Sequence, residues 1–220
     1  YIEYLFLLSL CALTSLSLPP FNFLLINFFT FSFFFIFLIK KYKETSKINK
    51  RFFFYYGLIF GFGYFASNLY WISISLTFDE SFKFLIPLSV VLIPGFLSIF
   101  YGIFSYLFII FKPKKILNSF LFFSLMFGLL EYIRGSILTG FPWNLIAYSF
   151  SNQIEILYIT SIIGTYSFNL FCISLFTSPA ILILKEKKKD IIVPIFFLIT
   201  TILFYIYGSL NMQKFNELEL

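Results

Sequence analysis

One acid–base pair lies inside an otherwise apolar stretch of the chain. Glu131 and Arg134 are three residues apart, so on a helix they share a face and can form an ion pair. Such a pair has two possible roles. It can be structural and connect its helix to neighbouring helices, or it can line a polar mouth that receives a lipid head group or the edge of another domain. Arg134 lies about five residues, roughly 7 Å, before the expected helix end, so its side chain could also extend to the membrane surface.

A turn follows this pair. Gly140, Phe141, Pro142 and Trp143 are expected to end the helix, because Gly and Pro interrupt helices while aromatic rings favour the membrane interface. The simpler interpretation is a membrane-exit turn with an aromatic anchor. Tyr148 belongs to a following loop rich in neutral hydrogen-bonding groups, and such a loop could support a bound domain.

The other tryptophan of the chain lies in a second candidate segment. Asn68, Tyr70 and Trp71 follow a glycine-containing apolar run, and Asn68 must find a hydrogen-bond partner within the helix bundle. The topology derived below places Trp71 and Trp143 at the same membrane interface. Two rare Trp residues at one interface favour an aromatic belt, and a shared outer cleft is the alternative.

The composition excludes several kinds of site. The chain has no His and only 2 Cys, which rules out a Cys/His metal site. It shows no glycine-rich nucleotide loop, no paired carboxylates of a proton relay and no nucleophile with an adjacent base. The net charge of +6 comes from short basic clusters between apolar runs, which is typical of membrane topology and not of a nucleic-acid surface. We therefore expect no catalytic residue, metal or cofactor within this chain.

Apolar runs are the elements that must position these residues. The chain is 60% hydrophobic and 12% charged, more apolar than a soluble domain of 220 residues could bury. A spanning helix needs about 20 apolar residues. Seven runs qualify, at about 2–18, 22–39, 52–78, 84–111, 116–138, 157–184 and 191–210. The sequence predicts an all-α membrane protein, a bundle of about seven transmembrane helices over residues 1–210.

The basic residues predict the orientation of this bundle. Most of the 16 Lys and Arg residues lie in every second loop, after the second, fourth and sixth runs. The positive-inside rule places these loops in the cytoplasm. The N-terminus is then cytoplasmic, and residues 211–220 are periplasmic, on the same side as the segments that hold Trp71 and Trp143.

Taken together, these residues resemble the membrane portion of bacterial apolipoprotein N-acyltransferases. The resemblance rests on Leu18-Pro19-Pro20-Phe21, Gly61-Phe62-Gly63-Tyr64-Phe65, Tyr70-Trp71-Ile72, Glu131 and Arg134 before Thr139-Gly140-Phe141-Pro142-Trp143, Tyr148-Ser149, and Ile163-Gly164-Thr165-Tyr166. That family transfers an acyl chain from a phospholipid to the N-terminal diacylglyceryl-cysteine of lipoproteins, in the bacterial inner membrane.

The resemblance implies which parts of the reaction this chain holds. It implies a phospholipid acyl donor, a diacylglyceryl-modified lipoprotein and membrane lipid as partners, with no nucleic acid and no cofactor. The family's Glu-Lys-Cys triad lies in a nitrilase-like periplasmic domain, which would follow residues 211–220 and is absent here. Cys11 and Cys172 lie in the wrong segments to be that nucleophile. We therefore expect the isolated chain to be inactive.

Two alternatives remain open from the sequence. The membrane part of a two-part polyprenyl-phosphate mannose synthase resembles the same family without the acyl chemistry. A small transporter or a non-catalytic membrane scaffold is the other possibility. A transporter predicts an inverted repeat and polar groups near the midplane, whereas the polar groups here gather toward one side.

Overall fold

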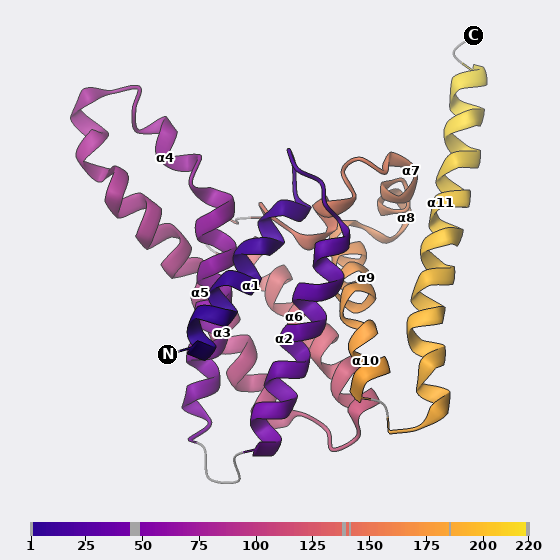
Figure 1. Ribbon diagram of the computed structural model, residues 1–220. Helices are drawn as coiled ribbons and strands as arrows, with labels where there is room; N and C mark the ends of the chain where they lie inside the picture. Colours follow the sequence, from indigo (N-terminus) through magenta and orange to yellow (C-terminus); the bar gives the residue numbers. More distant parts are fainter. Residues whose placement is uncertain (1, 45–48, 138–139, 141, 185, 219–220) are drawn as a thin grey trace.

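The computed structural model describes residues 2–44, 49–137, 140, 142–184 and 186–218, with side chains described as far as residue 213. Every regular element within these residues is helical, and they contain no strand, which confirms the predicted all-α class (Figure 1). In chain order the elements are α1 (Ile2–Thr14), η1 (Ser15–Ser17), α2 (Leu25–Glu44), α3 (Arg51–Leu69), α4 (Ile72–Ser75), η2 (Glu80–Leu85), α5 (Ile86–Phe111), α6 (Ile116–Ser136), η3 (Ile146–Phe150), α7 (Ile154–Leu157), α8 (Thr160–Ile163), α9 (Thr165–Thr177), α10 (Pro179–Leu184), η4 (Lys188–Ile191) and α11 (Ile192–Leu218).

Each of the seven predicted runs contains a helix. Among the described residues, five helical segments are long and apolar enough to cross a membrane: Leu25–Glu44, Glu80–Phe111, Ile116–Ser136, Thr165–Leu184 and Lys188–Gln213. The first run forms a shorter apolar helix, Ile2–Ser17. The chain is thus a multi-pass membrane protein, and the total of seven spans stays a prediction.

Helix α2 ends at Glu44 and α11 at Leu218, beyond the predicted runs, and two other runs are interrupted. The third run extends to residue 78, but α3 ends at Leu69; beyond it, Ser73 and Thr77 donate side-chain hydrogen bonds to carbonyls three residues back, which competes with helix continuation. The sixth run is broken at Gly164, where φ is 79°, and α9 ends just before Pro179. Hydropathy averages over these local features and therefore predicted longer segments.

Helix α3 lies between α1 and α5, and its glycines allow both contacts. A Cβ added at Gly57 would lie 2.1 Å from the carbonyl oxygen of Tyr101 on α5, and one at Gly61 would lie 2.9 Å from the Tyr101 Cβ. On the other side, a Cβ at Gly63 would lie 2.6 Å from the Leu8 carbonyl oxygen on α1. Side chains at these positions would push the helices apart, so the glycines fix the spacing of this three-helix layer.

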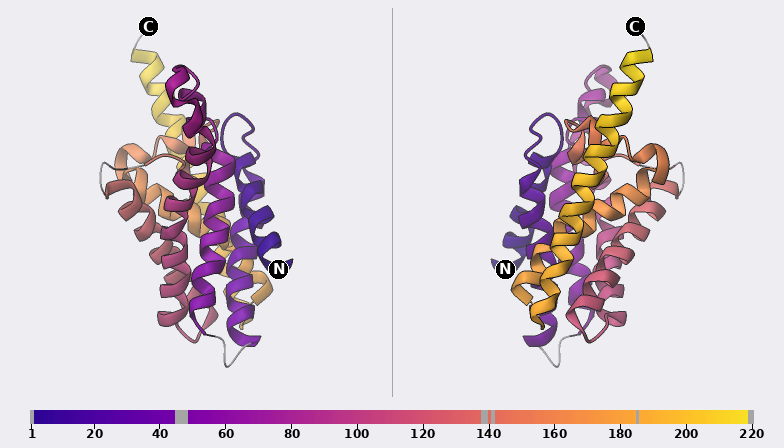
Figure 2. Two further views of the ribbon diagram at one scale, coloured as in Figure 1. Left: turned by 90° about the vertical axis from the view of Figure 1, so that its left-hand side faces the viewer. Right: turned by 90° about the vertical axis from the view of Figure 1, so that its right-hand side faces the viewer.

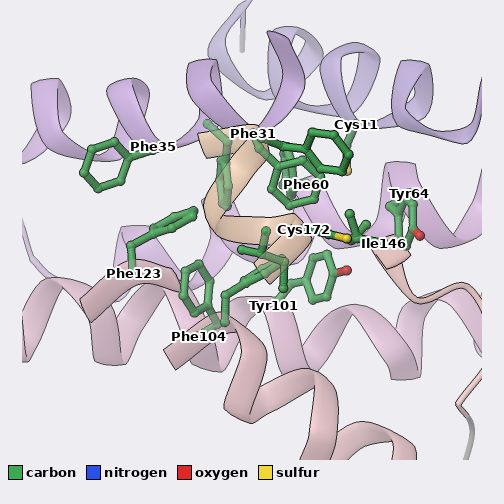
Figure 3. Packing of buried hydrophobic residues seen from close by; sticks show 14 of the residues in the cluster. Cys11, Phe31, Phe35, Phe60, Tyr64, Tyr101, Phe104, Phe123, Ile146 and Cys172 are labelled. Carbon is green, nitrogen blue, oxygen red and sulfur yellow. The ribbon is translucent and has the colours of Figure 1, made fainter. Parts of the chain in front are cut away.

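Aromatic rings fill the centre of the bundle. Phe34 of α2 stacks on Phe60 of α3 with ring centroids 3.7 Å apart, and Phe104 of α5 meets Phe127 of α6 at 4.5 Å. Figure 3 shows this cluster, with rings from several helices pointing toward one another. In lipid no hydrophobic effect drives helices together, so packing contacts such as these between rings stabilise the bundle.

The loops divide between two ends of the bundle. The C-terminal ends of α2, α5 and α10 lie toward one end of the bundle, which we call the basic end (Figure 1). There the Ile116 amide donates to Glu186 Oε1 at 3.3 Å, and Lys41 Nζ lies 2.5 Å from Glu3 Oε1 near the N-terminus. The opposite end, where α1 ends and α4 lies, we call the mouth end, and α11 runs toward it (Figures 1 and 2). Trp71 directly precedes α4. This arrangement agrees with the predicted alternation of loops, while the side of the membrane that each end faces stays a prediction.

Candidate functional site

Glu131 and Arg134 occupy the last two turns of α6 and form a buried ion pair. Arg134 Nη2 lies 2.6 Å from Glu131 Oε2, and Arg134 Nε donates to Glu131 Oε1 at 3.2 Å. The two residues are 2% and 0% exposed. Arg134 therefore points into the protein, and the predicted alternative of an arginine that extends to the membrane surface is not what the structure has.

The same guanidinium holds the loop that follows α6. Arg134 Nη1 and Nη2 each donate to the Trp143 carbonyl oxygen at 3.3 Å, and the Arg134 Cζ lies 5.2 Å from the centroid of the Phe65 ring on α3. A buried charge is tolerated when an opposite charge and hydrogen bonds surround it. The pair thus connects α6, α3 and the loop, which is the first of the two roles predicted for it.

Further hydrogen bonds fasten this loop to other helices. The Tyr64 hydroxyl of α3 donates to the Asn144 carbonyl oxygen at 2.6 Å, and the Ala147 amide donates to Asn169 Oδ1 of α9 at 3.0 Å. Gly140 at the start of the loop has φ of 73°. A side chain at Gly140 would be strained in this conformation, and its Cβ would lie 2.7 Å from the Gly135 carbonyl oxygen.

The two tryptophans of the chain meet at the mouth end. The rings of Trp71, at the end of α3, and Trp143 stack with centroids 5.1 Å apart and an angle of 18° between their planes. They are 40% and 49% exposed. The two predicted arrangements are an aromatic belt and a shared cleft. The rings stack on each other, but Trp71 lines one hollow and Trp143 an adjoining one, so a shared cleft stays a prediction.

Trp71 forms part of the wall of a cavity of about 570 Å³. Neutral polar and aromatic side chains share this wall with apolar ones. The described residues that line it include no Lys, Arg, Asp or Glu: Ser15, Leu18, Pro19, Pro20, Phe21, Ser67, Asn68, Tyr70, Trp71, Asn144, Tyr148 and Ser151. Burial raises the pKa of Tyr148, with a further contribution from nearby Tyr166, so its hydroxyl stays protonated and can donate a hydrogen bond. The lining suits the uncharged polar part of an amphiphile next to its apolar chain.

The predicted site residues gather at this end in two layers. Asn68, Tyr70, Trp71 and Tyr148 line the cavity. Pro142 and Trp143 line an adjoining hollow of about 330 Å³, which Asn144 and Tyr148 share. Glu131 and Arg134 lie beneath, buried, and position the loop without lining either space. Phe141 lies outside the described residues.

The sequence did not single out two residues that matter for this geometry. Tyr64 is 1% exposed and fixes the loop by donating a hydrogen bond to the Asn144 carbonyl oxygen. Asn169 lies on α9, more than twenty positions after Ala147 in sequence, and its Oδ1 accepts a hydrogen bond from the Ala147 amide. Both polar groups lie within apolar helices and must find partners there, which is the one signal that could have marked them. Their partners lie on other elements, and no local pattern specifies these.

Comparison with known proteins identifies a family to which this sequence is similar. The sequence model of the family described as apolipoprotein N-acyltransferase N-terminal domain matches residues 10–177. Relatives named apolipoprotein N-acyltransferase include one from Rhodopseudomonas palustris, 32% identical over 174 residues (78% of this chain and 32% of the relative). Another, from Rhizobium etli, is 33% identical over 175 residues (77% and 32%), and one from Rickettsia prowazekii is 32% identical over 197 residues (87% and 38%).

The matched region includes the last residues of α1, all of α2 to α8, and the loop that Arg134 holds. The chain spans about a third of the length of these curated relatives. The match to the family covers well over half of this chain. The chain belongs to the apolipoprotein N-acyltransferase N-terminal domain family.

Proposed function

We propose that this chain is the membrane domain of an apolipoprotein N-acyltransferase in the bacterial inner membrane. The enzyme moves an acyl group from a phospholipid ester to the free amine of a diacylglyceryl-modified cysteine at the N-terminus of a lipoprotein, where an amide bond forms. The observation that carries this proposal is the uncharged cavity of about 570 Å³ that Trp71 and the loop held by Arg134 enclose, in a chain of this family.

The cavity supports a role in admitting lipid-bearing substrates. Both proposed substrates carry acyl chains next to ester and hydroxyl groups, and the lining offers apolar surface together with Ser, Asn and Tyr side chains. Apolar helices around the cavity let such molecules approach from within the bilayer. The membrane domain would then position substrates, while a nucleophile elsewhere in the enzyme carries the acyl group.

The orientation of the bundle belongs to the same proposal. The basic end faces the cytoplasm and the mouth end faces the periplasm, as the distribution of Lys and Arg favours. Helix α11 runs toward the mouth end (Figure 1). A catalytic nitrilase-like domain placed after this helix would therefore lie over the cavity, on the side where lipoproteins are modified.

A chimera tests the function directly. Residues 1–220 would replace the matching part of the Rickettsia prowazekii relative, which is 32% identical to this chain over 197 residues. The purified chimera, reconstituted with phospholipid and a diacylglyceryl peptide, should yield N-acylated peptide detectable by mass spectrometry. A chimera that elutes as a folded, monodisperse protein and forms no product, while the parent does, would contradict the proposal.

A further inference from the structure

A second hollow lies on the lipid-facing side of the bundle and shares no lining residue with the mouth-end cavity. This groove has a volume of about 440 Å³, and α2, α10 and α11 form its walls. Its lining includes Phe29, Phe33 and Ile36 of α2, Ile183 of α10 and Leu198 of α11. Each of these side chains except Ile36 is more than a third exposed, so the groove is open to the bilayer.

Local helix geometry explains why the groove exists. The Ser32 hydroxyl of α2 donates to the Phe176 carbonyl oxygen at 3.0 Å, which holds α2 against the end of α9. The helix then breaks, and Pro179 begins α10. Pro194 lies in the first turn of α11, and both prolines line the groove. The hollow therefore lies where α10 and α11 begin, beside a firmly packed α2.

Lysines flank the groove at the basic end of the bundle. Phe29, Phe33, Ile36 and Lys40 recur at intervals of four, three and four residues, so Lys40 continues the stripe of α2 that lines the groove. On the other side, the exposed Lys188 and Lys189 begin η4, which lies between α10 and α11 in the chain. Lys40 therefore continues one wall of the groove in sequence, and Lys188 and Lys189 precede the helix that forms another wall.

We propose that this groove binds an anionic phospholipid of the leaflet at the basic end. An acyl chain occupies the apolar groove, and the phosphate lies between Lys40 and the pair Lys188 and Lys189. The wall suits an acyl chain because its described lining is apolar apart from two serine side chains. Lysines near a membrane surface attract anionic head groups. The volume is within the range of ligand sites in proteins. Lipid binding in this groove does not require acyl transfer. An experiment on the groove therefore tests this proposal separately from the function proposed for the mouth-end cavity.

Native mass spectrometry of the purified chain tests this proposal. The chain is equilibrated in detergent with equal amounts of phosphatidylglycerol and phosphatidylcholine, and the retained lipids are counted. We expect preferential retention of phosphatidylglycerol, and a loss of about tenfold in that preference when Lys40, Lys188 and Lys189 are all replaced by Ala. Filling the groove with Ile183→Trp should lower the retention of both lipids.

A matched control separates a site from general surface charge. Lys114 and Lys115 are exposed at the same end but lie in the loop between α5 and α6. Their replacement by Ala should leave the lipid preference of the folded chain unchanged. Equal retention of the two lipids by the native chain, or an equal loss of preference in the Lys114/Lys115 variant, would overturn the proposal. The lysines concerned are exposed, so their replacement should leave the fold intact, which thermal unfolding checks.

Discussion

Removing the Arg134 guanidinium should destabilise the protein much more than removing a surface lysine. Arg134→Met leaves the Glu131 carboxylate, which is 0% exposed, without its opposite charge, and breaking a buried pair in this way costs about 3–5 kcal/mol. The double variant Glu131→Leu with Arg134→Met removes both charges. Of the loss in the single variant, the double variant keeps only the part that both share, the loss of the Arg134 donors to the Trp143 carbonyl, which costs about 1–3 kcal/mol. The double variant should therefore be roughly 2 kcal/mol more stable than the single one.

An exposed pair of the same spacing serves as the control. Glu80 and Lys83 are also three residues apart and form an ion pair, but their side chains are 86% and 45% exposed. Lys83→Met should change the stability by less than about 1 kcal/mol. Equilibrium unfolding in mixed detergent micelles measures all three variants. Equal losses for Arg134→Met and Lys83→Met, or a double variant less stable than Arg134→Met, would refute this view of the buried pair.

Three other predictions concern packing, the tryptophan stack and orientation. Gly57→Ala should lower stability by about 1–3 kcal/mol because its Cβ would meet backbone 2.1 Å away, whereas Gly95→Ala, with nothing within 4 Å, should be neutral or slightly stabilising in the same unfolding assay. Trp71→Phe should abolish an exciton couplet in the far-ultraviolet circular dichroism, because its ring stacks on the other indole; an unchanged spectrum would argue against the stack. In spheroplasts, a membrane-impermeant maleimide should label Glu80→Cys directly but Lys188→Cys only after permeabilisation, and the reverse pattern would invert the topology.

Local signals explain what the sequence predicted well. The positions of the helices follow from apolar runs, and the pairing of Glu131 with Arg134 follows from their spacing on one helix face. The alternation of basic loops likewise predicted that α2, α5 and α10 end on the same side of the bundle (Figure 1). These features need only neighbouring residues in the chain, so a single sequence contains them.

Contacts between distant elements explain what the sequence left open. Whether Arg134 points inward depends on Phe65 and on the Trp143 carbonyl, which lie on other segments. The stacking of Trp71 on Trp143 depends on a loop that Tyr64 fastens from α3 through a residue eighty positions away. The end of α3 at Leu69 likewise lies within an apolar run that continues to residue 78, so an average of hydropathy does not locate it.

The mouth-end cavity is the central element of this account, and acyl transfer by the chimera tests it most directly. Trp71→Ala removes a ring of the cavity wall, and Trp143→Ala removes the ring that stacks on it. Each change should lower the rate of peptide acylation by up to about 100-fold, since displaced substrates lose their productive position. Phe196→Ala removes a ring that is 60% exposed on α11, away from the cavity lining, and should leave the rate unchanged. Equal rates for all three folded variants would contradict a role for the cavity in acyl transfer.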